Sequence, residues 1–266
     1  MQNKNILSID YDSLTISAMR DLVKKVLGEV AKNGLPDKHH FYITFITNFK
    51  SVTIPDILKN KYPDVIWLVD AVSSMAGIKI EVDKLGIDFI LSSTQKAWGI
   101  PAGFSVVSVS DKIFEKSKTI DNKGYYFDLM TYEKYYLKNQ TPTTPSISHL
   151  FGLQYILDKI DKEGLENRWN RHIKMAEHTR LWANNHGQSL FPEPGCESYT
   201  LTCIKNDQNW NIEALNEKLL NRGFRMDRGY GNLRYKAFRI AHMGNVYFDD
   251  LNEYLNVIDE LLLEIK

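Results

Sequence analysis

Two residues that could act together, an acid and an amine, each follow a short apolar run. Asp70 comes directly after the run at 65–69, and Lys96 stands 26 residues later, just past a second run at 87–93. Short runs without alternation are typical of strands buried on both faces of a sheet. Because ligands of open α/β sheets sit beyond the carboxyl ends of the strands, we expect both side chains to face one crevice. The alternative is an ordinary strand-end aspartate and a solvated lysine.

A third candidate, Arg239, stands inside the strand-like apolar stretch at 236–241. A guanidinium in such a stretch is costly without an anionic partner, and its planar fork suits a carboxylate better than a lysine would. The neighbouring His242 is expected to be a structural histidine. The other histidines, including the pair at 39–40, show no ligand spacing.

The helices and strands expected around these residues indicate an α/β protein with a smaller α+β unit at its C-terminal end. Helices are expected at 10–34, 54–61, 125–137, 146–160, 165–184, 211–221 and the C-terminus. Strands are expected at 40–47, 65–69, 87–93, 104–109, 198–205 and 236–241. Two helices have an apolar face that should be buried: Leu165, Trp169, Ile173, Ala176 and Leu181 in one, and Leu251, Leu255, Ile258, Leu262 and Ile265 in the last.

Composition narrows the class of protein. The 266 residues carry no net charge, which argues against nucleic acid and anionic membranes as partners. No apolar run is long enough to span a bilayer, and the first residues open no signal peptide. The two cysteines, Cys196 and Cys203, lack metal-ligand spacing and are expected to be thiols, so we predict no metal and a cytoplasmic location.

Several short motifs occur in a fixed order from Asp70 onward. They are DAVSS at 70–74, STQKA at 93–97, PAGF at 101–104, QTPTTPS at 140–146 and FRIAHMGN at 238–245. With them, residues 64–266 resemble class V aminotransferases, nearest the alanine–glyoxylate, serine–pyruvate and phosphoserine branch. That family uses pyridoxal 5′-phosphate (PLP) and has the PLP-dependent transferase fold type I.

The resemblance implies a role for each residue around the cofactor. Lys96 would form a Schiff base with the PLP aldehyde and, once displaced by substrate, move the proton between Cα and C4′. Asp70 would keep the pyridine nitrogen protonated. Val72 would pack on the ring, although a plain core valine is the alternative. Thr94 and Gln95 would help to hold the phosphate, with exposed loop polar residues as the alternative.

Two further roles follow from the same resemblance. Thr144 would reach the phosphate of the neighbouring subunit's cofactor in a homodimer, although its place before a proline also suits a helix N-cap. Arg239 would bind the substrate carboxylate. The implied reaction moves an amino group from an amino acid to a 2-oxo acid.

The N-terminal part follows another pattern. Residues 8–63 resemble the N-terminal half of SspB-type adaptors, which deliver tagged substrates to the ClpXP protease, through the motifs at 34–36, 39–45 and 58–63. No Gly/Ser- or Pro-rich linker separates the two resemblances. We therefore expect a chimera of an SspB-like α+β fragment (1–63), a partial PLP-binding large domain (64–160) and a small α+β domain (161–266).

This arrangement affects the expected activity. Class V members carry a phosphate loop at a helix N-terminus upstream of the position of Asp70, and this chain shows no such motif. We therefore expect PLP affinity weakened by several kcal/mol, impaired turnover, and an aggregation-prone product with open strand edges. The alternative functions are a ClpXP adaptor acting through residues 8–63 and a catalytically dead PLP-fold remnant.

Overall fold

A computed structural model describes residues 63–264. The SspB-like resemblance and the elements expected before residue 63 lie outside these residues. The described chain divides into two compact units. Unit 1 holds the described residues up to 72 together with 80–95 and 100–156, and unit 2 holds 73–79, 96–99 and 157–264. The three-domain prediction, made from family resemblance, remains a prediction.

Unit 1 is built on a three-stranded sheet with the order β1-β2-β3. The strands are β1 (Leu68–Asp70), β2 (Phe89–Ser93) and β3 (Ser105–Val109). β1 pairs with β2 in parallel, with Asp70 opposite Leu91, and β3 runs antiparallel to β2. The carboxyl ends of β1 and β2 therefore meet at one edge of the sheet, as predicted for Asp70 and the residues after Ser93.

The burial of these strands differs from the prediction of a sheet buried on both faces. In β2, Ile90 and Ser92 are buried while their neighbours are half-buried, and none of the β3 residues is buried. β3 is the last strand in the described order, and its Val107 is 48% exposed. The apolar run at 104–109 therefore predicts a strand but not its burial.

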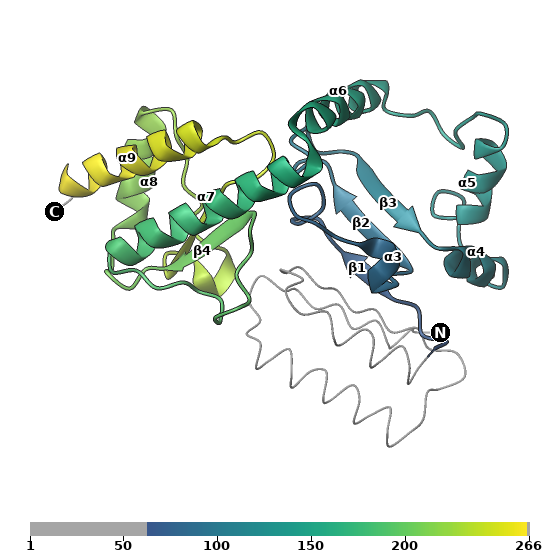
Figure 1. Ribbon diagram of the computed structural model, residues 1–266, viewed down its shortest axis with the longest axis horizontal. Helices are drawn as coiled ribbons and strands as arrows, with labels where there is room; N and C mark the ends of the chain where they lie inside the picture. The colour runs from purple at the N-terminus through teal and green to yellow at the C-terminus, as the bar shows by residue number, and fades with distance from the viewer. Residues whose placement is uncertain (1–62, 265–266) are drawn as a thin grey trace, which may run out of the picture. The chain divides into compact units, whose positions relative to one another are not determined.

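Helices α3 (Val82–Leu85), α4 (Asp111–Lys118) and α5 (Leu129–Tyr136) complete unit 1 with the first part of α6 (Ile147–Glu163) (Figure 1). α5 was expected to begin at 125. It begins later because the side chain of Asp128 caps it by accepting a hydrogen bond from the backbone N–H of Met130, at 3.1 Å.

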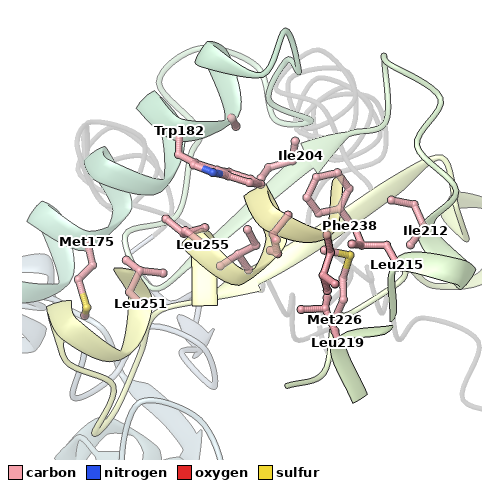
Figure 2. Packing of buried hydrophobic residues seen from close by; sticks show 14 residues of the cluster. Met175, Trp182, Ile204, Ile212, Leu215, Leu219, Met226, Phe238, Leu251 and Leu255 are labelled. Atoms are coloured by element: carbon pink, nitrogen blue, oxygen red, sulfur yellow. The ribbon is translucent and has the colours of Figure 1, made fainter. Parts of the chain in front are cut away.

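Unit 2 contains α7 (Leu165–Asn185), β4 (Leu201–Lys205), α8 (Ile212–Asn221), the short 3₁₀ helix η2 (Gly231–Leu233), β5 (Ala237–Ala241) and α9 (Phe248–Glu264). The two strands pair antiparallel, and α7, α8 and α9 pack around them. Figure 2 shows the side chains that fill the space between these elements. The core consists of Met175, Trp182, Ala183, Ile204, Ile212, Leu215, Leu219, Met226, Phe238, Ile240, Leu251, Leu255, Ile258 and Leu261. Burying each large apolar side chain contributes about 1.5–3 kcal/mol, so this core holds the helices and strands of unit 2 together.

The buried faces of the two long helices differ from the predicted ones. In α9, Leu251, Leu255 and Ile258 are buried as predicted, but the next buried residue is Leu261, while Leu262 is only partly buried. In α7, the predicted Leu165 and Leu181 are 53% and 59% exposed. Its buried face is formed by Arg168, His172, Met175, Ala176, Thr179, Trp182 and Ala183. The prediction used apolar residues alone and missed a face that is partly polar.

Candidate active site

Asp70 belongs to unit 1 and is the last residue of β1. It is half-buried, and its Oδ1 accepts a hydrogen bond from the backbone N–H of Val72 at 2.9 Å. Within residues 63–264, its second carboxylate oxygen accepts no hydrogen bond. Val72 is also half-buried, which is compatible with either role considered for it. A carboxylate held by its own turn, with one oxygen still available, can accept a proton donor of a ligand.

Thr94 follows β2 directly and is fully buried. Its hydroxyl donates to the carbonyl oxygens of Pro101 at 2.7 Å and Phe104 at 3.2 Å. Because a hydroxyl has one proton, this geometry leaves none for a phosphate. The predicted direct phosphate contact of Thr94 is therefore not supported, and the exposed-loop alternative is wrong for this residue. Thr94 instead holds the segment at 100–104 against the end of β2.

Gln95 and Thr144 are both exposed in unit 1. The side-chain oxygen of Gln95 accepts a hydrogen bond from the hydroxyl of Ser93. Thr144 lies three residues before the start of α6, and it is Ser146 whose carbonyl accepts the first helical N–H, from Leu150 at 3.1 Å. The N-cap interpretation of Thr144 is therefore wrong, because the cap position belongs to Ser146.

Lys96 belongs to unit 2, on the short segment at 96–99. It is half-buried, and its amine donates no hydrogen bond to any part of the chain that the structure describes. The segment turns tightly, with the N–H of Gly99 donating to the carbonyl of Lys96 at 2.9 Å. Gly244 lies against this turn, because a Cβ at Gly244 would stand 3.2 Å from the Lys96 carbonyl oxygen. The backbone of Lys96 is thus fixed while its amine stays available.

Arg168 of α7 anchors that turn. Its side chain is 1% exposed, Nη2 donates to the carbonyl of Ala97 at 2.8 Å, and Nε donates to the carbonyl of Ala76 at 2.8 Å. Nη1 pairs with Glu163 Oε2 at 3.1 Å. Burial alone would raise the pKa of Glu163, but hydrogen bonds and charges from Arg171 and Arg168 lower it. This buried ion pair places the residue after Lys96.

His172, one turn further along α7, forms hydrogen bonds with backbone groups of the same region. Its Nδ1 donates to the carbonyl of Arg168 at 2.7 Å, and Nε2 accepts from the N–H of Gly244 at 3.1 Å. Protonation of Nε2 would set two donors against each other. Burial, which is the largest cause, and the charges of Arg171 and Arg168 lower the pKa of His172 to about 4, while the charge of Glu163 acts to raise it.

We therefore expect the free energy of unfolding to fall between pH 6.5 and about 4. In this window the unfolded chain protonates His172 while the folded chain does not, so the contribution present above pH 6.5 is lost as the pH falls. The loss should be on the order of 3 kcal/mol at the lower end. Urea unfolding of wild type and His172→Gln, measured from pH 7 to pH 4.5, tests this. Equal pH slopes in the two proteins would contradict the assignment.

Arg239 lies on β5, and its partner is Asp227. Nε and Nη2 donate to the two carboxylate oxygens at 3.0 and 2.8 Å, and the backbone N–H of Arg239 donates to the carbonyl of Asp227 at 3.2 Å. Burial would raise the pKa of Asp227, but the Arg239 and Gly229 hydrogen bonds and the charges of Arg239 and Lys96 lower it. The charge of Lys96 therefore acts on the Asp227–Arg239 pair within unit 2.

His242 was expected to be a structural histidine with its hydrogen bonds satisfied, but its buried Nδ1 has no hydrogen-bond partner within the described residues. It is fully buried, its Nε2 lies 2.8 Å from the hydroxyl of Thr202, and burial first lowers its pKa to about 3. Cys196 and Cys203 are not joined in a disulfide. Within residues 63–264, no three His, Cys, Asp or Glu side chains gather as metal ligands, and no helix is long and apolar enough to cross a membrane.

Comparison with known proteins places this geometry in a family. The model of the family described as "Aminotransferase class-V" matches residues 47–229, which is more than half of the chain. This chain belongs to the class V aminotransferases. The match begins upstream of the residue 64 at which the resemblance was expected to start, inside the stretch assigned to the SspB-like fragment.

The class V relatives cover most of this chain. An uncharacterized aminotransferase of Methanocaldococcus jannaschii is 38% identical over 184 residues, which are 68% of this chain and 48% of the relative. A serine–glyoxylate aminotransferase of Arabidopsis thaliana is 33% identical over 211 residues, 78% of this chain and 52% of the relative. The chain thus spans about half the length of these curated relatives.

Solved structures show the same α/β aminotransferase fold. The alanine–glyoxylate aminotransferase of Nostoc sp. superposes with a TM-score of 0.79 at 23% identity, over 94% of this chain and 66% of the other. The pyridoxamine–pyruvate aminotransferase of Mesorhizobium loti superposes with a TM-score of 0.80 at 22% identity, over 97% of this chain and 66% of the other.

Class V membership implies PLP, and the described residues fit that cofactor in part. Lys96 offers an amine that donates no hydrogen bond, and Asp70 offers a carboxylate oxygen that accepts none, within the described chain. The hydroxyl of Thr94 is committed to the backbone. The described residues thus offer an amine and a carboxylate oxygen, while the Thr94 hydroxyl is used by the chain itself.

Proposed function

We propose that this chain is a PLP-dependent aminotransferase that moves an amino group from an amino acid to a 2-oxo acid, with Lys96 as its cofactor-binding lysine. The observation that carries this proposal is the available amine of Lys96 on a turn held in place by Arg168. When bound, PLP supplies an aldehyde for an amine and a ring that withdraws electrons from the substrate.

Each of the chain's own residues would then have a separate role. Lys96 Nζ would hold the cofactor and would act as the base and acid that moves the Cα proton of the substrate. Asp70 would keep the pyridine nitrogen protonated, and Val72 would pack on the ring. Gln95 contacts the phosphate from its exposed position, while Thr94 positions the adjoining turn instead of touching the phosphate. Arg239 binds the substrate carboxylate.

The partners follow from the same proposal. Several relatives are named glyoxylate aminotransferases, which makes glyoxylate a good first 2-oxo acid to test. We propose a homodimer, supported by exposed apolar residues of α6 in unit 1, namely Ile147, Leu150, Phe151 and Tyr155. Thr144, just before this helix, would contact the cofactor of the partner subunit. A cytoplasmic location, weak PLP affinity and impaired turnover remain predictions, and the comparisons do not favour the ClpXP adaptor alternative.

Single-turnover assays test the function directly. The full chain loaded with PLP is mixed with alanine, serine or aspartate, and the 2-oxo acid released is quantified. We expect stoichiometric release for at least one donor. A folded protein that binds PLP but releases no 2-oxo acid would support the catalytically dead alternative instead.

Asp227 should affect substrate binding through its contact with Arg239. Because it holds the Nε and Nη2 edge of the guanidinium, Asp227→Asn is expected to raise KM for the amino acid and the 2-oxo acid by about 3–10-fold with kcat little changed, the effect being moderated by solvent. Asp227→Glu should recover part of the loss. Steady-state kinetics measure both. A lower KM in Asp227→Asn would mean that Asp227 competes with substrate.

A further inference from the structure

A pocket of about 500 Å³ in unit 2 has a marked excess of arginine. Its lining comes from one stretch of chain between α8 and β5, and it consists of Arg225, Met226, Asp227, Arg228, Gly229, Tyr230, Gly231 and Arg234. Three of these eight residues are arginines. The volume suits a ligand of the size of an amino acid or a small organic acid.

The charges around this pocket do not cancel. Asp227 is paired with Arg239, and Arg228 is paired with Glu213. Arg225 makes no hydrogen bond or ion pair with the residues at 63–264, and Arg234 forms no ion pair there, its guanidinium lying 4.9 Å from the ring centroid of Tyr235. Four arginines therefore face two carboxylates, which leaves an excess of two positive charges.

The shape of the loop is fixed by its backbone. Gly229 has a φ of +76°, and a Cβ there would lie 2.5 Å from the carbonyl oxygens of Leu233 and Ala237. Its N–H donates to Oδ1 of Asp227 at 3.0 Å. Only glycine allows this close approach, so the loop that carries the arginines is held in one shape before a ligand arrives.

The pocket also adjoins the proposed substrate arginine. Asp227 lines it and at the same time holds both nitrogens of the Arg239 fork. An organic acid whose first carboxylate is bound by Arg239 would therefore direct a second acidic group toward the excess positive charge. Arginine is well suited to that group, because its planar donors match a carboxylate.

We propose that this pocket binds the distal carboxylate of the substrate, so that the enzyme acts on dicarboxylic amino acids and dicarboxylic 2-oxo acids. This rests on the proposed function, because it takes Arg239 as the binding site of the first carboxylate. Arg225 and Arg234 determine the preference for the second carboxylate. Neither takes part in the amino-transfer chemistry.

Calorimetric titration of the PLP-loaded full chain at low ionic strength tests the proposal. The probes are oxaloacetate and 2-oxoglutarate, each compared with a monocarboxylate of the same chain length, 2-oxobutyrate and 2-oxopentanoate. We expect the wild type to bind at least one dicarboxylate about tenfold more tightly than its matched monocarboxylate. The double variant Arg225→Gln/Arg234→Gln should lose that advantage and keep its monocarboxylate affinity.

Arg222→Gln is the control for the type of substitution, because it replaces one exposed arginine at the end of α8 that pairs with Glu260 and does not line the pocket. It should keep the dicarboxylate advantage. Equal binding of both acid classes by the wild type, or an equal loss in the control, would overturn the proposed pocket. Failure of the wild type to bind either class would instead overturn the proposed carboxylate site at Arg239, and the pocket's role with it.

Discussion

Lys96→Ala is expected to lower the rate of amino transfer by at least about 10²–10⁴-fold, the contribution of a positioned acid–base group, and to remove covalent attachment of PLP. The reason is chemical, because a methyl group can neither bond to the aldehyde nor carry the Cα proton. The wild-type turn should persist, since Arg168 contacts the carbonyl of Ala97 and not the lysine side chain.

The control for this variant is Lys174→Ala, an exposed lysine of α7 in the same unit. It should keep both activity and cofactor attachment. Addition of a small primary amine should restore part of the lost rate to Lys96→Ala, because the amine can replace the missing base. Unchanged single-turnover release of 2-oxo acid by Lys96→Ala would show that another residue holds the cofactor.

Arg168→Met is expected to lower the free energy of unfolding by about 3–5 kcal/mol, the usual cost of removing one partner of a buried ion pair. The substitution leaves Glu163 without one of its two arginines and leaves the carbonyl oxygens of Ala76 and Ala97 without their donor. Burying an unpaired polar group adds to the cost, and the methionine packs only the aliphatic part of the space.

Urea unfolding at pH 7 measures this difference. Arg168→Lys should recover only part of the loss, because a single ammonium cannot reach Glu163 and both carbonyls in the arginine's fixed geometry. Arg222→Met, at an exposed pair with Glu260 whose atoms lie 3.6 Å apart, should change stability by no more than about 1 kcal/mol. A loss in Arg168→Met no larger than that of Arg222→Met would show that Arg168 does not anchor the Lys96 turn.

Much of the fold follows from periodicity along the sequence. The strands at β1, β2, β4 and β5 and the helices α6 to α9 occur where short apolar runs and helical spacing predict them. The buried face of α7 does not follow from periodicity of apolar residues. Arg168 and His172 are buried because they form hydrogen bonds to backbone groups far away in the sequence, and hydropathy cannot detect this form of burial. The prediction that β3 is buried was wrong for a related reason, since the elements around a strand decide whether its side chains are buried.

The candidate site shows a similar division. Lys96, Asp70 and Arg239 are identified by short motifs, because the chemistry requires those residue types at fixed places. Asp227 and Arg168 were missed, since the partners that give them their roles, Arg239 and the carbonyl of Ala97, lie 12 and 71 residues away along the chain. One signal was available: Arg168, His172, Met175, Thr179 and Trp182 recur every three or four residues, which indicates one helix face once polar residues are admitted.

Thr94 shows how a motif can place a residue correctly and still mislead about its role. Its position beside Lys96 is the one that the resemblance predicted, but its proton is used by Pro101 and Phe104. The role of a hydroxyl depends on which acceptors lie around it, and the acceptors here come from a turn seven and ten residues further on.

The most direct test of the central claim is to trap the lysine–cofactor bond and locate it. The full chain is incubated with PLP, reduced with borohydride, digested and analysed by mass spectrometry, with the wild type compared to Lys96→Ala and Asp70→Asn. We predict one major adduct on the peptide that contains Lys96, absent from Lys96→Ala and weaker at equal PLP in Asp70→Asn. An adduct spread over exposed lysines, or equal labelling of all three proteins, would contradict the proposed roles of Lys96 and Asp70.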